Sequence, residues 1–567
     1  MHRHVEAYLL SASDTLRKYN NNPKTMYGNM TKTKLKGWLC AVLVLVATCA
    51  QASVNIIPQP TQVREGKGTF LLKDRMNIGV NDPALADAGA YLREILSRAT
   101  GFNGIAVRQG KGNINLVLQP TDDKADESYS LSVTKSQVTI KAASYRGVIN
   151  GISTLRQLLP DEIESQTPIG NVRWTVPVVQ VNDKPAYHWR GLMLDPSRHF
   201  YSVEETKQFL DHMALYKYDK FHWHLTDGVA WRIEIKKYPL LTQRGAWREF
   251  RQDIDINCEN RAKNENNPTL LIPTKYCREE NGRRLYGGFY TQDEIREVVR
   301  YAAVRGIDVI PEIDMPGHFW CATQAYPMLS CGQDGNDPLC LGKDLTLDFC
   351  RDVWSEVFQL FPYEYAHIGG DEVERSRWTK CADCQKRIAD LKLKGVEELQ
   401  AWFTKGMEQF FNQHGRKLMG WDEILEGGVS RTATVYWWRG DHPDVAQKST
   451  GMGNEVVICP TTYCYFDYGQ DDNTVKRIYT SDVIPADMTA DQLKLVKGIQ
   501  SNIWGEFIPT VARMQFMVFP RALAMVEKAW TPREAQDWDN FEQRMKTHLH
   551  RLEAAGINYR PLQTTQP

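Results

Sequence analysis

Residues 365–372 read YAHIGGDE, a short apolar run that ends in two glycines and two adjacent carboxylates, Asp371 and Glu372. A run of this length, bounded by turn residues, is typical of a strand buried in a parallel sheet. Seven similar runs, separated by helical segments, lie at 191–194, 220–225, 307–313, 417–420, 434–436, 455–458 and 498–503. Eight buried strands that alternate with helices predict an α/β fold, a (β/α)8 TIM barrel.

The segment before the barrel has a different pattern. Helical spacing over 83–100 and 146–159 flanks two alternating runs, 129–133 and 138–142, which predict a hairpin. We therefore expect a small α+β domain over 53–184, followed by a catalytic barrel with a C-terminal helical tail over 185–567. Nothing in the small domain concentrates chemistry, so we interpret it as structural.

Residues 1–52 are interpreted as an upstream extension and a signal peptide. Three lysines precede the apolar run 38–47, and Ala50-Gln51-Ala52 follows it. This order is typical of a secretory signal, and the run is too short to cross a bilayer. We expect translation to begin at Met26 or Met30 rather than Met1. The sequence thus predicts a protein exported to the periplasm or the medium, with lipid anchoring at Cys49 disfavoured.

Composition excludes several classes of protein. The 567 residues carry 69 Lys+Arg and 69 Asp+Glu, with 42% apolar residues, which is an ordinary globular profile. A net charge of zero argues against a nucleic-acid partner. Neither a P-loop nor a G-x-G-x-x-G motif is present, so we expect no nucleotide cofactor.

Ten cysteines remain once the signal is removed, an even number in an oxidising compartment. Several are close in sequence, and we expect disulfides that staple loops, with a connectivity that the sequence leaves open. The C-x-x-C at 381–384 is also compatible with a redox or metal site. No second pair has zinc-site spacing, so we expect no metal.

Barrel enzymes place their active sites at the carboxyl ends of the strands. Here the ends carry carboxylates, histidines and aromatic residues: Asp195; His222, His224 and Asp227; Glu312 and Asp314; Asp371 and Glu372; Trp421 and Asp422; Trp437 and Trp438; Tyr465 and Asp467; Trp504 and Glu506. Tryptophans offer flat walls to sugar rings, while carboxylates and Arg190 can hydrogen-bond hydroxyl groups. This set predicts a neutral, polyhydroxylated ligand.

The adjacent carboxylates Asp371 and Glu372 suggest the reaction. Their charges repel, so we expect one to have a raised pKa and to act as a general acid. Most glycosidases use two separated carboxylates. In the substrate-assisted variant the acetamido group of the sugar is the nucleophile, and the enzyme needs only an acid and a neighbour that orients that group.

Six motifs carry a resemblance to a known family: WRGLMLD (189–195), FHWHLTD (221–227), PEIDMPGH (311–318), HIGGDEV (367–373), GWDE (420–423) and IWGE (503–506). The chain resembles the family-20 glycoside hydrolases, the β-N-acetylhexosaminidases, of the exported, chitobiase-like bacterial type. The resemblance implies retaining, exo-acting hydrolysis of terminal non-reducing β-linked N-acetylglucosamine or N-acetylgalactosamine, without a cofactor. Chitooligosaccharides are the first expected substrate, and the sequence leaves the oligomeric state open.

The resemblance also implies roles for matching residues. Glu372 would be the acid and then the base, Asp371 would hold the acetamido N–H, and Tyr465 would donate to the acetamido oxygen. His318 and Asp227 would support Glu372. The pocket walls would be Trp421, Trp437 and Trp504, with Trp438 competing for the place of Trp437. The sugar hydroxyls would bind Arg190, Asp467 and Glu506, although Arg190 is also compatible with a structural ion pair.

Two alternatives agree with parts of the sequence. His222-Trp223-His224 resembles the metal-binding H-x-H of amidohydrolase barrels, but the histidines expected on the fifth and sixth strands are replaced by tryptophans. A catalytically silent chitooligosaccharide-binding protein is the second alternative. The intact Asp371-Glu372 pair argues against it, because a binding protein needs no acid.

Overall fold

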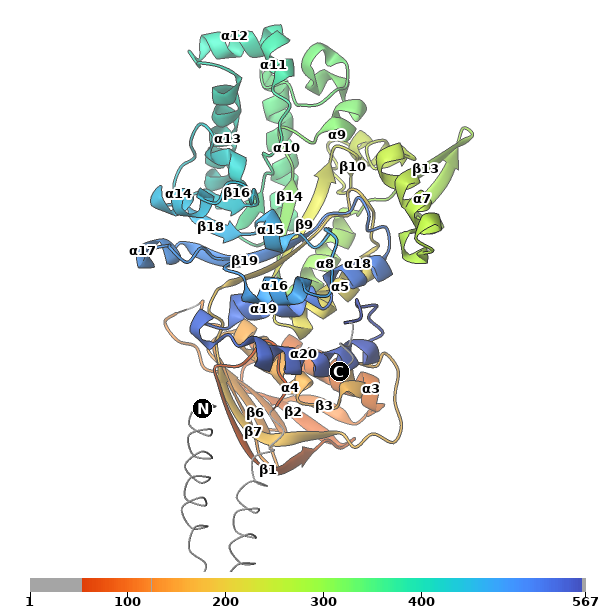
Figure 1. Ribbon diagram of the computed structural model, residues 1–567, viewed down its shortest axis with the longest axis vertical. Helices are drawn as coiled ribbons and strands as arrows, with labels where there is room; N and C mark the ends of the chain where they lie inside the picture. The colour runs from red at the N-terminus through yellow and green to blue at the C-terminus, as the bar shows by residue number, and fades with distance from the viewer. Residues whose placement is uncertain (1–53, 124, 563–567) are drawn as a thin grey trace, which may run out of the picture. The chain divides into compact units, whose positions relative to one another are not determined.

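The computed structural model describes residues 54–123 and 125–562 (Figure 1). The predicted extension and signal peptide, 1–52, lie outside the described residues. The small domain and the barrel belong to one compact unit that begins at Asn55. Among the residues described, no helix combines the length and apolar character needed to cross a bilayer.

A closed barrel of parallel strands forms the larger part of this unit. In order around the barrel the strands are β8 (Trp189–Leu194), β9 (Lys220–Asp227), β14 (Asp308–Ile313), β15 (Tyr365–His367), β16 (Lys417–Trp421), β17 (Thr434–Trp437), β18 (Glu455–Ile458) and β19 (Val496–Ile503). β19 pairs with β8, and β8 with β9, which closes the ring. All eight predicted runs are therefore strands, and the predicted TIM barrel is confirmed.

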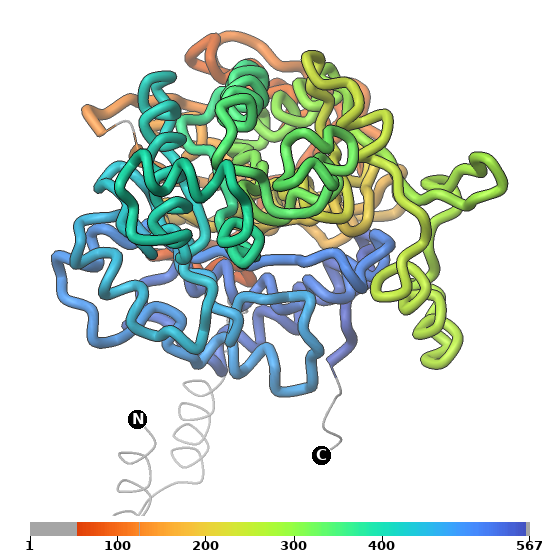
Figure 2. Tube along the Cα trace, turned by 90° about the horizontal axis from the view of Figure 1, so that it is seen from above, coloured from red at the N-terminus to blue at the C-terminus, as the bar shows by residue number. Residues whose placement is uncertain are grey.

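Helices connect the strands and cover the barrel. The main ones are α5 (Val203–Leu215), α8 (Gln292–Val304), α10 (Asp344–Leu360), α13 (Val396–Gln413), α14 (Val445–Gly451), α16 (Thr474–Thr480), α18 (Val511–Val518) and α19 (Arg521–Trp530). Reciprocal caps begin α5 at Ser202 and α8 at Thr291, which satisfies the first free N–H groups of each helix. Seen from above in Figure 2, the chain proceeds around the barrel from yellow through green to blue.

The barrel interior is filled in layers. The ring of Trp189, the first residue of β8, packs edge-on against Tyr365 and Tyr436, with centroids 6.0 Å apart in each pair. Above them lie the imidazoles of His222 and His367, whose centroids are 4.6 Å apart. Side chains alternate between the two faces of a strand. A residue that is next in the strand to one of these interior residues therefore points away from the barrel interior.

The small domain is a seven-stranded mixed sheet in the order β1-β7-β5-β6-β4-β2-β3. Its strands are β1 (Gln62–Leu71), β2 (Met76–Val80), β3 (Ile105–Gln109), β4 (Ile114–Leu118), β5 (Tyr129–Val133), β6 (Val138–Ala142) and β7 (Thr175–Asp183), and its helices are α3 (Ala86–Thr100) and α4 (Tyr145–Gln157). The predicted hairpin is β5–β6.

The C-terminal helix α20 (Trp538–Ala554) links both parts of the unit. Its Arg544 pairs with Glu527 of α19, and its Arg551 pairs with Glu164 of the small domain, 2.8 Å away. These partners are buried, so each arginine compensates a carboxylate that would otherwise be costly to bury. The helix thereby fixes the small domain against the base of the barrel.

The cysteines differ from expectation. In the part of the chain that the structure describes, all ten carry free thiols, and none forms a disulfide. Nine of them are buried. The expectation of loop-stapling disulfides is therefore wrong for this structure. That expectation rested on cysteines that are close in sequence, whereas four of the cysteines come together in space from two different loops.

Candidate active site

A cavity of about 350 Å³ opens at the carboxyl ends of the barrel strands. Its lining residues are Arg198, Asp227, His318, Asp371, Glu372, Trp421, Trp438, Tyr465, Asp467, Tyr468, Trp504, Glu506 and Phe507. This set contains all the predicted site residues except Arg190 and Trp437.

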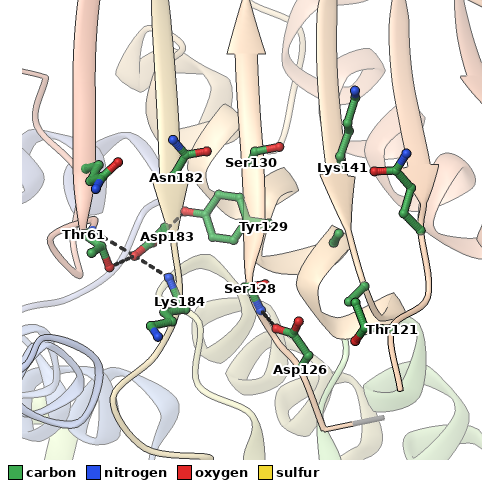
Figure 3. A pocket seen from close by; sticks show the side chains of 14 residues that line it. Thr61, Thr121, Asp126, Ser128, Tyr129, Ser130, Lys141, Asn182, Asp183 and Lys184 are labelled. Carbon is green, nitrogen blue, oxygen red and sulfur yellow. Dashed lines mark hydrogen bonds between the residues drawn. The ribbon is translucent and has the colours of Figure 1, made fainter. Parts of the chain in front are cut away.

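A second cavity, of about 470 Å³, lies on the sheet of the small domain (Figure 3). Its central carboxylate, Asp183, accepts hydrogen bonds from the hydroxyl of Tyr129 at 2.8 Å and from the backbone N–H groups of Thr61 and Lys184. Of the described residues that line it, none has a polar side-chain atom buried without a partner. No buried polar atom of this lining therefore calls for a ligand, in line with a structural role for the domain.

In the barrel cavity, His318 lies among three carboxylates. Its Nε2 is 3.5 Å from Glu372 and 3.6 Å from Asp371, and its Nδ1 is 3.6 Å from Asp227. Burial alone would lower the pKa of His318, but the charges of Asp227 and Asp371 and the hydrogen bond to Glu372 raise it well above its usual value. His318 is therefore held as a cation beside Glu372.

Asp371 and Glu372 have opposite surroundings although they are adjacent. The side chain of Glu372 is 60% exposed in the cavity, and its pKa is lowered, chiefly by the hydrogen bond from His318. Asp371 is buried, and burial raises its pKa. The expected raised pKa thus falls on Asp371 and not on the exposed Glu372.

The oxygen Oδ1 of Asp371 is buried, and no N–H group of the described residues donates to it. A buried acceptor without a donor is costly, and such groups are rare unless they serve a ligand. The neighbouring carboxyl of Asp314 can share a proton with Asp371, since burial and the charge of Asp371 raise the pKa of Asp314 well above the usual range. A ligand N–H is the natural further partner for Asp371.

Glu312 organises the layer beneath the cavity. The Nε2 of His222 and the Nδ1 of His367 each lie 3.1 Å from it, His224 also contacts it, and the indole N–H of Trp421 donates to it at 2.8 Å. The histidines of the H-x-H motif therefore both contact a buried carboxylate in this layer. Glu312 holds Trp421 in place, and His224 also contacts Asp227.

Aromatic rings wall the cavity. Trp421 and Trp504 lie with centroids 5.8 Å apart, and Trp438 stacks on Tyr465 at 6.3 Å. The pKa of Tyr465 is raised well above its usual value by burial, so its hydroxyl keeps its proton. A hydrogen bond with Trp504 opposes that rise. An indole N–H can only donate, so in this bond the phenol oxygen accepts and the phenol proton remains available to a ligand.

Trp438, and not Trp437, lines the cavity. Tyr436 points into the barrel, where its ring contacts His222 and His367. By strand alternation Trp437 points outward, and its indole N–H donates to the carbonyl of Arg439 at 2.9 Å. The indole N–H of Trp438 instead donates to Glu423 at 2.9 Å, so the prediction of Trp437 as a wall is wrong.

Arg190 is also misplaced by the sequence interpretation. It is the second residue of β8, about 13 Å of strand before Leu194 at roughly 3.3 Å per residue. Its guanidinium is fully buried and donates to Glu127 of the small domain at 2.6 Å and to the carbonyls of Tyr187 and Lys217. Arg190 therefore forms a structural ion pair at the base of the barrel, far from the cavity.

The cavity arginine is Arg198, which the sequence interpretation missed. It lies 2.8 Å from Asp227 and 3.6 Å from Glu506, and its guanidinium covers the ring of Trp504 at 5.0 Å. The signal was present, since Arg198 follows the strand-end Asp195 by three residues. It lies in the loop after β8, however, and the strand motif itself contains only Arg190.

Asp467 is a further carboxyl group of the cavity. Burial raises its pKa to about 7, and its Oδ1 is buried without a partner. Burial also raises the pKa of Glu506, against the opposing charge of Arg198. These groups give the cavity a second set of hydrogen-bonding positions in addition to Asp371 and Glu372.

Comparison with known families decides the assignment. The model of "Glycosyl hydrolase family 20, catalytic domain" matches residues 187–533, and that of "Glycosyl hydrolase family 20, domain 2" matches residues 53–184. The chain belongs to glycosyl hydrolase family 20. It is accordingly a glycoside hydrolase, as the strand-end carboxylates and tryptophans predicted.

Relatives in family 20 resemble the chain over most of its length. A β-hexosaminidase of Porphyromonas gingivalis is 37% identical, over 92% of this chain and 67% of that protein. The exo-β-N-acetylglucosaminidase of Vibrio harveyi, solved in complex with N-acetylglucosamine, has a TM-score of 0.76 and 31% identity, over 90% and 79% of the two chains. The β-N-acetylhexosaminidase of Streptomyces coelicolor has a TM-score of 0.74 and 30% identity, over 91% and 99%.

Proposed function

We propose that this family-20 enzyme is an exo-acting β-N-acetylhexosaminidase that removes terminal non-reducing β-linked N-acetylglucosamine or N-acetylgalactosamine with retention of configuration. One observation carries the proposal. The buried Oδ1 of Asp371, to which no N–H group of the described residues donates, lies beside the exposed carboxyl of Glu372 in a cavity walled by tryptophans. One carboxylate is thus ready to accept an N–H, while its neighbour can exchange a proton with a leaving group.

The substrate's own acetamido group is the nucleophile in this mechanism. Asp371 accepts the acetamido N–H, and the hydroxyl of Tyr465 donates to the acetamido oxygen, which attacks the anomeric carbon. Glu372 protonates the departing glycosidic oxygen as the C–O bond breaks. The positive charge that develops on the oxazolinium ring is stabilised by the neighbouring Asp371 carboxylate.

Water then completes the reaction. Glu372, now ionised, accepts a proton from a water molecule that attacks the anomeric carbon and opens the oxazolinium ring. Each attack inverts the configuration, so two attacks restore it. The same residue therefore serves first as the acid and then as the base.

His318 supplies the acidic form of Glu372. In the free enzyme the histidine is cationic and Glu372 is ionised, so the pair holds one transferable proton between atoms 3.5 Å apart. A bound sugar excludes water from the 60% exposed Glu372. Desolvation penalises an ion pair more than a neutral pair, so substrate binding shifts this proton to Glu372.

Other residues of the cavity bind the terminal sugar. Arg198, Asp467 and Glu506 offer charge-assisted hydrogen bonds to ring hydroxyls, while Trp421, Trp438 and Trp504 cover the apolar faces of the ring. A cavity of about 350 Å³ suits one terminal residue better than the middle of a chain. Chitooligosaccharides are the first substrate that we propose.

The decisive experiment compares an aryl β-N-acetylglucosaminide with the matching aryl β-glucoside, which lacks the acetamido group. The mature protein, from Ser53 onward, should hydrolyse only the first. Glu372→Gln should lower kcat by about 10²- to 10⁴-fold, the usual worth of a general acid. The control is Glu374→Gln, an exposed carboxylate two residues away, which should match wild type.

Two results would reject the proposal. Equal hydrolysis of both substrates would exclude participation of the acetamido group. No hydrolysis by the wild type, combined with retained binding of chitobiose, would place the protein among sugar-binding proteins instead.

We also propose that the enzyme is exported, because three lysines, an apolar run at 38–47 and Ala50-Gln51-Ala52 form a signal-like sequence. N-terminal sequencing of protein isolated from the host's exported fraction tests this. A mature chain beginning near Ser53 is expected, and an intact Met26 or Met30 start in the cytosol would contradict it.

A further inference from the structure

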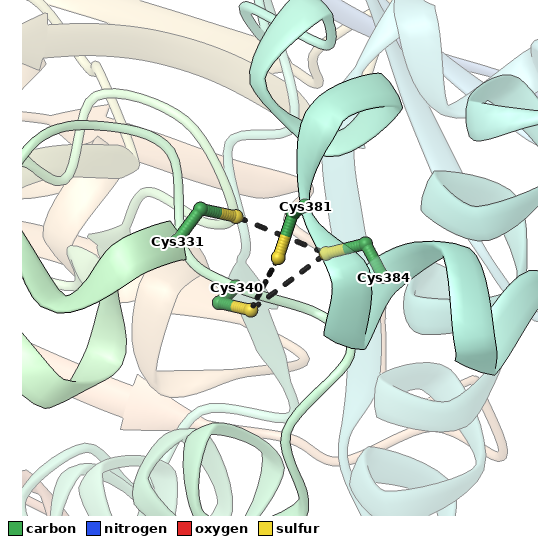
Figure 4. A group of neighbouring side chains, drawn as sticks. All are labelled: Cys331, Cys340, Cys381 and Cys384. Carbon is green, nitrogen blue, oxygen red and sulfur yellow. Dashed lines mark hydrogen bonds between the residues drawn. The ribbon is translucent and has the colours of Figure 1, made fainter.

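Four cysteines from two loops converge at one point beside the barrel. Cys331 and Cys340 belong to the segment that follows β14, while Cys381 and Cys384 flank and begin α12 (Ala382–Asp390), after β15. Figure 4 shows their sulfur atoms directed toward one another from both sides. All four side chains are buried, and the sulfurs all lie within 4.8 Å of one another.

The distances match a shared tetrahedral ion rather than disulfide bonds. The sulfur of Cys340 lies 3.6 Å from Cys381 and 3.7 Å from Cys384, and the sulfur of Cys331 lies 3.8 Å from Cys384. A disulfide requires about 2.05 Å. Zn–S bonds of about 2.3 Å place the corners of a tetrahedron about 3.8 Å apart.

The contacts allow one set of two disulfides, Cys331–Cys384 and Cys340–Cys381. Cys340 is equally near to two partners, and Cys384 is also near to two. That set would leave the 3.7 Å contact between Cys340 and Cys384 unexplained, whereas one central ion uses all four sulfurs alike. The ligand set contains only sulfur, which selects zinc or iron among common biological metals.

The surroundings favour thiolates. Cys381 caps α12 and Cys384 lies in its first turn, where the positive end of the helix dipole stabilises negative charge. Gly342, two residues after Cys340, lies against the start of the same helix. Gly342 is required there, because a Cβ atom would lie 2.2–2.4 Å from backbone atoms of Asp383 and Cys384.

We propose that Cys331, Cys340, Cys381 and Cys384 bind one structural Zn²⁺ ion. The site has four protein ligands and no open position, as structural zinc sites do. It therefore takes no part in the chemistry of the cavity, and the proposal stands apart from the proposed function.

The ion would join the two loops that carry the acid machinery. Leu339, next to Cys340, donates its N–H to the carbonyl of Pro316 at 3.0 Å, two residues before His318. The buried Trp378, three residues before Cys381, donates its indole N–H to the carbonyl of Leu339 at 2.8 Å. The zinc site thus pins the segment bearing His318 to the one that follows Asp371 and Glu372.

Metal analysis of the wild-type protein, purified without chelators from the compartment where it resides, tests the proposal. We expect about one zinc per chain by mass spectrometry of the metals. Cys381→Ser/Cys384→Ser should lose it. The control is Cys459→Ser/Cys464→Ser, a second buried, closely spaced pair outside the cluster, which should keep the metal.

Two further measurements keep the test independent of how the variants fold. In the wild type, four thiols should resist alkylation until a chelator is added, and peptide mapping should assign them to the four cysteines. Cobalt substitution should produce the visible absorption of a tetrahedral thiolate site. A metal-free wild type, whether its four sulfurs are disulfide-linked or freely alkylated, would overturn the proposal, as would zinc retained by the cluster variant.

Discussion

The Nε2 atom of His318 lies 3.5 Å from a carboxylate oxygen of Glu372. Both residues adopt a left-handed backbone conformation, with φ of 51° and 49°. Residues other than glycine rarely take such angles, and strain of this kind persists where the surrounding structure imposes it, often at functional sites. Here it turns two side chains from different loops toward each other across one cavity.

Because this pair shares a proton, the pH dependence of kcat/KM should follow His318. Its pKa is raised well above the usual value, since the charge of Asp227 and contacts with Asp371 and Glu372 outweigh burial. Activity should be lost as pH rises through that raised pKa and the pair loses its proton. Asp227→Asn removes the largest of these charges, so the alkaline limb should move to lower pH.

The measurement is a pH profile of kcat/KM for wild type, Asp227→Asn and Glu374→Gln. The last variant removes a carboxylate that lies outside the cavity lining and should leave the limb in place. An alkaline limb that stays unchanged in Asp227→Asn would show that His318 does not supply the proton.

Arg198 and Arg190 should have separable effects. Arg198→Gln removes charged hydrogen bonds at the cavity, worth about 1.5–3 kcal/mol, and should lower kcat/KM by about 10- to 100-fold. Arg190→Gln removes the nearest cationic partner of the buried Glu127, and breaking a buried ion pair costs about 3–5 kcal/mol of folding stability. Steady-state kinetics and denaturant unfolding of both variants test this. A larger loss of kcat/KM in folded Arg190→Gln than in Arg198→Gln would contradict it.

Substitutions of the neighbouring Trp437 and Trp438 should also have separable effects, one on stability and the other on sugar binding. Trp438→Ala removes a wall whose burial against a sugar is worth about 1.5–3 kcal/mol, so KM should rise by about 10- to 100-fold. Trp437→Ala opens a cavity in the packed exterior of β17 and should cost about 3–5 kcal/mol of stability. Inhibition constants for N-acetylglucosamine and thermal unfolding distinguish them; an exchange of the two phenotypes would mean that Trp437 is the wall.

Asp467 should make stability depend on pH. Its pKa is raised by burial from 3.8 to about 7, so the folded protein binds this proton more tightly than the unfolded chain. The sign follows from linkage: this contribution is present at low pH and is lost as pH rises from about 4 to about 7. Asp467→Asn should flatten that part of the curve of unfolding temperature against pH, whereas Asp467→Glu should keep it. A curve for the Asn variant parallel to wild type would contradict the assignment.

Much of the fold could be predicted because parallel strands buried on both faces appear as continuous apolar runs. All eight barrel strands correspond to such runs, and the capping residues Ser202 and Thr291 mark two helix starts. Residues that end a strand share one edge of the barrel whatever the details of packing. The sequence alone therefore suffices to group Asp371, Glu372, Trp421 and Trp504 into one site.

Side-chain direction was harder to predict. Trp437 and Trp438 are adjacent and chemically identical, so only the inward placement of Tyr436 in the barrel decides which of them faces the cavity. Arg190 lies near the amino end of β8, and Arg198 lies beyond its carboxyl end. To tell which of them reaches the cavity, one must know where the strand begins.

The sequence by itself determined the barrel, the family and most of the residues at the strand ends, because these follow from local periodicity and from motifs at fixed spacing. Only the tertiary structure decided which tryptophan walls the cavity, which arginine enters it, and that four cysteines from two loops meet at one point. Each of those outcomes depends on contacts between segments far apart in the chain, and no local pattern records where such segments meet.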